Sequence, residues 1–240
     1  MTKKLRSHPK YKRTRNAVIN PAPDPHCRCG TCIDGREKLW YTDCKGSGGA
    51  KNMYKICYTE ESTRRQRELE RGFLNLLCSQ PYDKITLTEL CRQLNVPRKS
   101  FYRYFPTKED CLLALVDHTL SECNDIALQG WDGSTALDEQ VQLRFFSYWM
   151  EHRDFLDMIR ENNFQHLLLD RTTAIVDRMK ENRTAGSFAR EQVEYFIAHG
   201  LMTTVLRWHH FGFPGRPEEM ARIFGSLLSS RDVSITRLLL

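Results

Sequence analysis

Basic, hydroxyl and aromatic side chains gather in one short stretch, from Arg98 to Lys108. An Arg or Lys in this stretch could read guanine through its O6 and N7 acceptors, a bidentate contact worth about 1–3 kcal/mol. Tyrosine hydroxyls can donate to phosphate oxygens while their rings brace a helix. A lysine at the start of a helix lies where backbone N–H groups already favour an anion. The chemistry available here is recognition of nucleic acid.

Two short helices joined by a turn would position these side chains. Apolar residues recur at helical spacing just before the basic stretch, at Leu87, Leu90, Cys91 and Leu94. Thr86 or Thr88 can cap that first helix, and Asn95 tolerates the left-handed backbone that a turn needs. Pro97 suits the first position of a second helix, because its missing N–H would be unpaired there anyway. The pattern predicts a helix-turn-helix, whose second helix enters the DNA major groove.

The stretch ITLTELCRQLNVPRKSFYRYFPTKEDCL, residues 85–112, resembles the DNA-binding signature of TetR-family transcriptional regulators. The hallmark residues are Phe101, Tyr102, Phe105 and Lys108, and Phe101 and Phe105 are expected on the buried side. The resemblance implies base-edge or groove contacts by Arg98, Lys99, Ser100 and Tyr104, and phosphate contacts by Thr88, Tyr102 and Lys108.

The turn between the two helices departs from the family pattern. Leu94 and Asn95 stand where Ala-Gly is usual, Pro97 replaces a Ser, and Lys99 occupies a position that is often Gly. Asn can still make the turn, but Pro97 has no side-chain oxygen with which to cap the second helix. These departures affect the expected DNA sequence preference and leave the resemblance intact.

A longer helix should precede the helix-turn-helix, from about Ser62, its expected N-cap, to Ser79. One face is apolar, with Leu69, Phe73, Leu76 and Leu77 at i, i+4, i+7 and i+8. The opposite face carries Arg64, Arg65, Arg67 and Arg71. Such a face is usually just solvated, but beside a helix-turn-helix it is equally compatible with phosphate contacts.

Charge is distributed unevenly along the 240 residues, whose formal net charge is +6. Residues 1–60 hold 13 Lys and Arg against 5 Asp and Glu, residues 61–108 hold 10 against 5, and residues 109–240 hold 13 against 20. A basic front and an acidic rear suit a protein that offers one end to nucleic acid. There is no apolar run of 18 residues and no hydrophobic signal core, so we expect a soluble, cytoplasmic protein without a membrane partner.

Residues 1–60 are basic and then Pro-rich, without helical periodicity, and we expect a disordered extension. Weak candidates for a zinc site are Cys27, Cys29, Cys32 and Cys44, although their C-x-C-x2-C spacing is not that of paired knuckles. We expect neither a metal nor a cofactor. Two further interpretations stay open: translation starts at Met53 and the first 52 residues are over-called, or the extension is a basic arm that adds phosphate contacts.

Every segment after residue 60 is helix-periodic, which predicts an all-α protein of about nine helices. The resemblance implies a DNA-binding domain at 61–108 and a larger effector-binding and dimerisation domain at 109–240. Adaptable side chains that could line the effector pocket are Phe146, Trp149, Met150, Phe155, Met158 and Met202. Aromatic and Met residues at helical spacing are, however, more often core than pocket.

The last two expected helices, 188–211 and 217–229, offer a dimer face. One stripe comprises Val193, Phe196, Ile197, Gly200, Leu201, Thr204 and Val205, and the other Met220, Ile223, Phe224, Leu227 and Leu228. Two such helices from each subunit would form a four-helix interface. Either stripe could instead be internal core.

These observations predict a homodimeric transcriptional regulator, most simply a repressor, that binds a near-palindromic DNA operator and is tuned by an unidentified small-molecule effector. The sequence has no Gly-rich phosphate loop, nucleophile elbow or HExxH motif, which argues against an enzyme. The alternative is a thiol- or metal-responsive DNA-binding sensor that uses the N-terminal cysteines.

Overall fold

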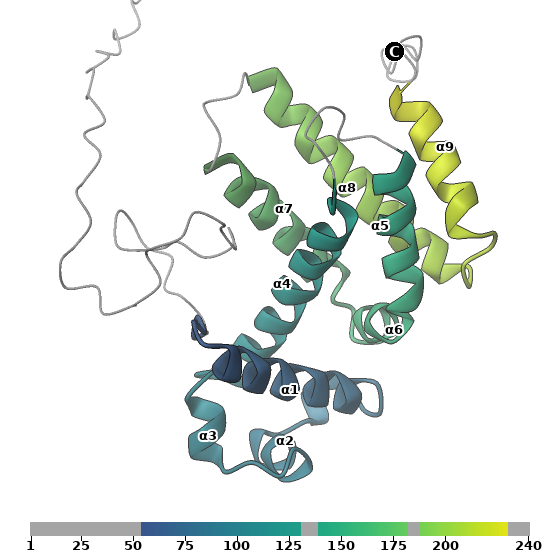
Figure 1. The fold of residues 1–240 in the computed structure, drawn as a ribbon. Coiled ribbons are helices and arrows are strands. Elements are labelled where there is room, and N and C mark those ends of the chain that lie inside the picture. The colour runs from purple at the N-terminus through teal and green to yellow at the C-terminus, as the bar shows by residue number, and fades with distance from the viewer. Residues whose placement is uncertain (1–53, 131–138, 182–187, 230–240) are drawn as a thin grey trace, which may run out of the picture. The chain divides into compact units, whose positions relative to one another are not determined.

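The computed structural model describes residues 54–130, 139–181 and 188–229, and every regular element among them is helical. Figure 1 shows α1, α2 and α3 together at one end of this part, with α4 leading from them to α5–α9. The elements are α1 (Glu60–Leu77), the 3₁₀ turn η1 (Tyr82–Lys84), α2 (Leu87–Gln93), α3 (Arg98–Tyr102), α4 (Lys108–Ala127), α5 (Glu139–Glu151), α6 (Arg153–Glu161), α7 (Gln165–Glu181), α8 (Phe188–His210) and α9 (Pro217–Ser229). The predicted all-α class is confirmed.

None of these helices, within the ranges described, combines the length and the apolar character that crossing a bilayer requires.

Helix α1 begins two residues earlier than predicted, and its N-cap is Thr59 rather than Ser62. The Thr59 hydroxyl oxygen accepts from the Ser62 N–H at 3.2 Å, and the Thr59 N–H donates to Ser62 Oγ at 3.3 Å. Ser62 is therefore the third helical residue of a capping box, in which both side chains satisfy backbone donors. The expected apolar face of α1 is buried, with Phe73 fully inaccessible.

The segment from Thr86 to Pro97 contains two features that the sequence predicts, a cap at Thr86 and a left-handed residue at Asn95. Its last residue, Pro97, differs from the prediction. Thr86 caps α2 by accepting from the Glu89 N–H at 3.2 Å, and Asn95 adopts the left-handed region with φ 51°. Pro97, however, is the N-cap of α3 and not its first residue, since its ψ of 143° is extended. Its carbonyl accepts from the Ser100 N–H at 2.8 Å, so the backbone starts the helix without a side-chain cap.

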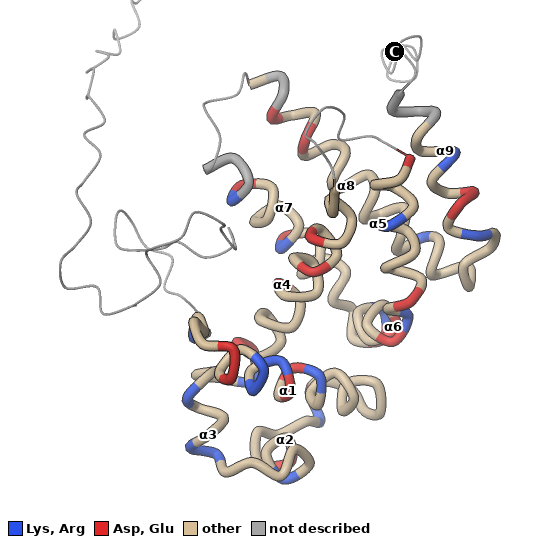
Figure 2. The backbone as a smooth tube through the Cα atoms, viewed as in Figure 1, with Lys and Arg blue, Asp and Glu red and all other residues tan. Residues whose placement is uncertain are grey.

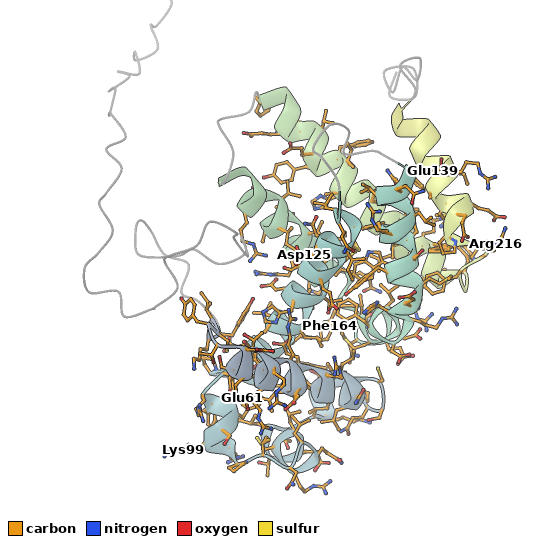
Figure 3. The ribbon with its side chains drawn as sticks, in the orientation of Figure 1. Glu61, Lys99, Asp125, Glu139, Phe164 and Arg216 are labelled. Carbon is orange, nitrogen blue, oxygen red and sulfur yellow. The ribbon has the colours of Figure 1, made fainter. Side chains whose placement is uncertain are left out.

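Helix α4 is the central element, because it packs against α1, α5 and α7. Helix α5 in turn packs against α9, and α7 packs against α8. One cluster of buried apolar side chains extends from α1 through α8. Phe164, labelled in Figure 3, joins the segment before α7 to η1, because its ring meets that of Tyr82 edge-on with 5.3 Å between centroids. The boundary expected at residue 108 therefore stays an interpretation.

A buried carboxyl group lies at the junction of α1 and α4. Glu70 is 2% exposed, and its two carboxyl oxygens lie 2.8 and 2.9 Å from His118 Nδ1. Burial raises the pKa of Glu70 to about 8; the Arg67 guanidinium opposes this shift, and the Asp117 carboxylate adds to it.

Raising the pH should therefore weaken the fold. The pKa of Glu70 is about 8 in the folded chain against an ordinary value of 4.5, so the folded state binds this proton more tightly. The resulting stabilisation is complete below pH 4.5 and is lost as the pH rises through about 8. We expect the free energy of unfolding, measured by denaturant titration, to fall across this window.

Glu70→Gln should remove this part of the pH dependence. Glu68→Gln is the matched control, because Glu68 is exposed on the same helix, and it should retain the parental profile. A parental profile in Glu70→Gln would contradict the assignment.

Candidate nucleic-acid interface

Helix α3 offers an exposed basic face. Arg98 and Lys99 are exposed, Tyr102 is 52% exposed, and Ser100 is half-buried. Figure 2 shows basic residues on α3 and no acidic one, and in Figure 3 the labelled Lys99 points away from the other helices. These four predicted contact residues therefore share one short helix with a surface suited to phosphates and base edges.

Two aromatic side chains, of Phe101 in α3 and of Phe105 three residues past its end, anchor this segment in the core, as predicted. Phe101 and Phe105 have no exposed surface, and their ring centroids are 5.3 Å apart. Two fully buried aromatic side chains fix both the position and the rotation of a helix that is too short to be stable alone. The exposed face of α3 is thus held by the apolar packing behind it.

A contact across the turn joins two of the predicted DNA-binding residues. The Arg98 Nη2 group of α3 donates to the Thr88 hydroxyl of α2. A guanidinium carries five N–H donors, so this bond orients Arg98 and leaves further donors for a base or a phosphate. Thr88 is exposed at the same surface.

The expected DNA contact by Tyr104 needs correction. Helix α3 ends at Tyr102, and the following turn directs Tyr104 into the core, where it is 6% exposed. Its carbonyl accepts from the Lys55 N–H at 2.9 Å, and Lys55 Nζ lies 5.6 Å from its ring centroid. Tyr104 therefore supports the end of α3 from inside. The resemblance to the family implied a groove contact for Tyr104, whereas its spacing of three residues from the buried Phe101 is compatible with the buried side.

Lys108 has an internal role that its sequence position did not indicate. Its Nζ donates to the carbonyls of Tyr82 and Ile85 at 3.0 and 2.9 Å, and it lies 3.8 Å from the centroid of the Tyr82 ring. The half-buried ammonium group thus ties the start of α4 to η1. Thr107 caps α4 and forms a capping box with Asp110. Contact between Lys108 and phosphate stays a prediction.

The arginines of α1 are mostly neutralised by neighbouring glutamates. Arg64 pairs with Glu61 at 2.8 Å and also with Glu68, and Arg65 pairs with Glu68 at 3.2 Å. Figure 2 shows acidic and basic residues interleaved along this helix. Exposed pairs of this kind contribute about 0–1 kcal/mol each to the stability of the fold. The pairing of these arginines with glutamates favours a solvated face over a phosphate-binding one.

Most of the expected effector residues are packed side chains of the core. Phe146, Trp149, Phe155 and Met158 are at most 1% exposed and Met202 is 3% exposed, whereas Met150 is 38% exposed at the surface. Ring contacts fill the space between these helices: Phe146 lies 5.8 Å from Trp208 and 5.5 Å from Phe224, centroid to centroid. Five of the six residues are thus packed core side chains in this structure, and their role in an effector pocket stays a prediction.

A cavity of about 240 Å³ lies elsewhere, beside the carboxyl-terminal end of α8. Its lining residues are Arg160, Gln165, Leu206, Arg207, His209 and His210, which include none of the six expected ones.

The two expected dimer stripes are divided between surface and core. On α8, Val193 and Phe196 are 54% and 55% exposed, whereas Val205 is fully buried. On α9, Ile223 is 52% exposed, whereas Phe224 packs against Phe146 of α5. The side chains of Leu227 and Leu228 lie outside the described residues. An apolar surface is thus present on both helices, and its role as a dimer face stays a prediction.

The cysteine candidates for a metal or thiol sensor, Cys27, Cys29, Cys32 and Cys44, lie outside the described residues. Within the described ranges, no group of three His, Cys, Asp or Glu side chains is placed to hold a metal ion. The described cysteines Cys91, Cys111 and Cys123 are buried, as small apolar side chains would be. Burial raises the pKa of the Cys111 and Cys123 thiols well above their ordinary value, which makes them unreactive.

Sequence reasoning missed three polar residues that connect the helices behind α3: Tyr54, Asp117 and Arg171. The Tyr54 hydroxyl and the Arg171 guanidinium both donate to the buried Asp117 carboxylate. Asp117 lies one turn beyond Leu113 in an otherwise apolar stretch of α4. A carboxyl group in such a stretch was the sequence signal that could have indicated a buried polar contact. Tyr54 belongs to the expected extension 1–60, yet its side chain is buried, and the next residue, Lys55, donates its N–H to the carbonyl of Tyr104.

Comparison with known proteins agrees with this geometry. Residues 74–115 match the family model described as bacterial regulatory proteins, tetR family. An uncharacterised HTH-type transcriptional regulator of Bacillus subtilis, YuxN, is 28% identical over 89 residues, which cover 35% of this chain and 30% of YuxN. The HTH-type transcriptional regulator EthR of Mycobacterium tuberculosis is 40% identical over 55 residues, which cover 23% of this chain and 25% of EthR. The chain thus spans less than a third of the length of these relatives.

A solved structure, a TetR transcriptional regulator from Streptococcus agalactiae, aligns over 70% of this chain and 95% of its own. Its sequence identity is 18% and its TM-score is 0.49, too low to support an assignment by itself.

Replacing Arg98 by Ala should relax the preference for one base pair while leaving the others unchanged. The lost discrimination should be about 1–3 kcal/mol if Arg98 reads a base edge. Fluorescence-anisotropy titrations against duplexes that differ at single base pairs measure this. Arg222→Ala is the matched control, because Arg222 is exposed on α9, far along the chain from α3. An equal loss on every duplex would show that Arg98 contacts only the backbone.

Lys108→Ala should weaken binding to all duplexes alike, because it removes the hydrogen bonds that connect the start of α4 to the carbonyls of Tyr82 and Ile85. The Lys108 ammonium group serves two carbonyls, so the slope of log affinity against log salt shows whether its third N–H also contacts a phosphate, and a parental slope means that it does not. Lys99→Ala, which removes an exposed charge, should reduce the steepness of that slope by about 0.9. If Lys108→Ala instead flattens the slope by the same amount, Lys108 contacts a phosphate directly.

Proposed function

We propose that this chain is a homodimeric repressor of transcription of the TetR family, a proposal supported by the match of residues 74–115 to the model of bacterial regulatory proteins, tetR family. The observation that carries the proposal is the face of α3 with exposed Arg98 and Lys99, backed by the buried Phe101 and Phe105. A rigid helix with basic donors on one side is suited to the DNA major groove. The protein binds DNA and has no catalytic role, and its place of action is the cytoplasm.

Two copies of the chain bind one operator. A single helix-turn-helix contacts too few base pairs to be selective, and two-fold dimers solve this by binding near-palindromic sites. The exposed Val193 and Phe196 of α8 and Ile223 of α9 support a dimer face on these helices. Gly200 adds support, because no atom beyond its chain neighbours and its own helix backbone lies within 4 Å of the position that a Cβ there would take, which leaves room for a partner helix to approach closely.

A small-molecule effector in the domain formed by α5–α9 controls DNA binding through α4. Support comes from the packing of α4 against α1 on one side and against α5 and α7 on the other. A ligand releases the operator only if it binds the DNA-incompetent state more tightly, and a shift from 1:99 to 99:1 requires about 5.5 kcal/mol of differential affinity. Because Phe146, Trp149 and Met158 are closely packed, such a ligand would have to open the core or bind outside it.

Genome-wide binding followed by footprinting tests the proposal. We expect protection of a near-palindromic site, with two half-sites about one helical turn apart. The same purified protein on a duplex with one half-site scrambled serves as the control and should bind much more weakly. Salt-steep binding without any sequence preference would contradict a repressor that recognises an operator.

A further inference from the structure

Residues 54–59, here called the N-terminal strap, connect the end of the recognition helix to α1. The Lys55 N–H donates to the carbonyl of Tyr104, two residues past the end of α3, at 2.9 Å. The Lys55 carbonyl accepts from Gln66 Nε2 of α1 at 3.1 Å, and the Gln66 side chain is 2% exposed. The strap is therefore bonded on both sides and is part of the DNA-binding end of the molecule.

The first residue of the strap reaches the middle of α4. Tyr54 is 9% exposed, and its hydroxyl donates to Asp117 Oδ2 at 2.7 Å. Its ring meets that of His118 edge-on, with 5.6 Å between centroids. The first residue of the strap thus contacts Asp117, which is 1% exposed and lies nine residues after the start of α4.

The same carboxylate is held from the opposite side by α7. Arg171 Nε donates to Asp117 Oδ1 and Arg171 Nη2 to Asp117 Oδ2, each at 2.5 Å. A buried carboxylate with a bidentate arginine and a phenolic donor is a strong arrangement, and losing one donor leaves charge poorly compensated. A displacement of α7 relative to α4 must therefore change how Asp117 holds Tyr54.

We propose that Tyr54 is a positioning residue that couples α7 to the recognition helix through Asp117 and the N-terminal strap. The path runs from Arg171 through Asp117 and Tyr54 to Lys55, whose N–H holds the carbonyl of Tyr104. This path does not include the start of α4, where Lys108 makes a separate contact with the carbonyls of Tyr82 and Ile85. The strap holds the end of α3 in the orientation that binds DNA, and this inference rests on the proposed DNA-binding function.

Operator affinity of strap variants tests the coupling. Tyr54→Phe removes only the hydroxyl and should weaken binding about tenfold, the size that residues coupling two sites typically show. Tyr58→Phe is the matched control, because Tyr58 lies on the same strap and is 69% exposed, and it should bind like the parent. Parental affinity in Tyr54→Phe would overturn the proposal.

A double-mutant cycle separates coupling from general destabilisation. Arg171→Gln on α7 should weaken operator binding to a similar degree, and the double variant with Tyr54→Phe should bind no more weakly than either single variant. Fully additive losses would mean that the two residues act independently, which would overturn the proposal.

Hydrogen exchange supplies a readout that does not depend on DNA. Arg171→Gln should accelerate exchange of the Lys55 amide, while amides of α9 keep their parental rates. Unchanged exchange at Lys55, or equal acceleration throughout the chain, would overturn the coupling. If the parent binds no DNA sequence preferentially, the proposed function fails, and the Lys55 amide still decides whether α7 is linked to the end of α3.

Discussion

The carboxylate of Asp117 is the constraint on which the arrangement of helices depends. Burying a carboxylate that is only 1% exposed costs free energy unless hydrogen-bond donors surround it. Here the donors are Arg171 of α7 and Tyr54 of the segment before α1. His118, the next residue of α4 after Asp117, makes a second polar contact there, with the buried Glu70 of α1. Polar contacts along one stretch of α4 therefore fix α1, α7 and the N-terminal strap relative to α4. Apolar packing alone would be less specific about their register.

The sequence predicted the elements well where local signals and periodicity agree. Asn95 indicated the left-handed turn, Thr86 was one of two candidates for the cap of α2, and Phe101 and Phe105 indicated the buried side of the segment that contains α3. Each of these residues acts within a few positions of itself in the chain. Local physical chemistry is sufficient for such assignments.

What could not be predicted depends on contacts between distant segments. Tyr104 is 6% exposed and contacts Lys55, 49 residues earlier in the chain, so the local sequence that implied a groove contact could not reveal its burial. Lys108 is occupied by carbonyls more than twenty residues earlier, and Asp117 by side chains 54 and 63 residues away. Phe146 and Trp149 belong to the core because α8, α9 and α6 supply rings against them, which no periodicity within α5 reveals.

The central claim is that the exposed face of α3 reads DNA while contacts behind it hold the helix in place. Acetylation of lysines by a water-soluble reagent tests this claim directly, because Lys99 is exposed on that face in the free protein. The reaction rate at Lys99 can be followed by mass spectrometry with the operator duplex or with an unrelated duplex. The account predicts strong protection of Lys99 by the operator at a salt concentration where the unrelated duplex gives little. Equal reactivity of Lys99 with and without the operator would contradict it.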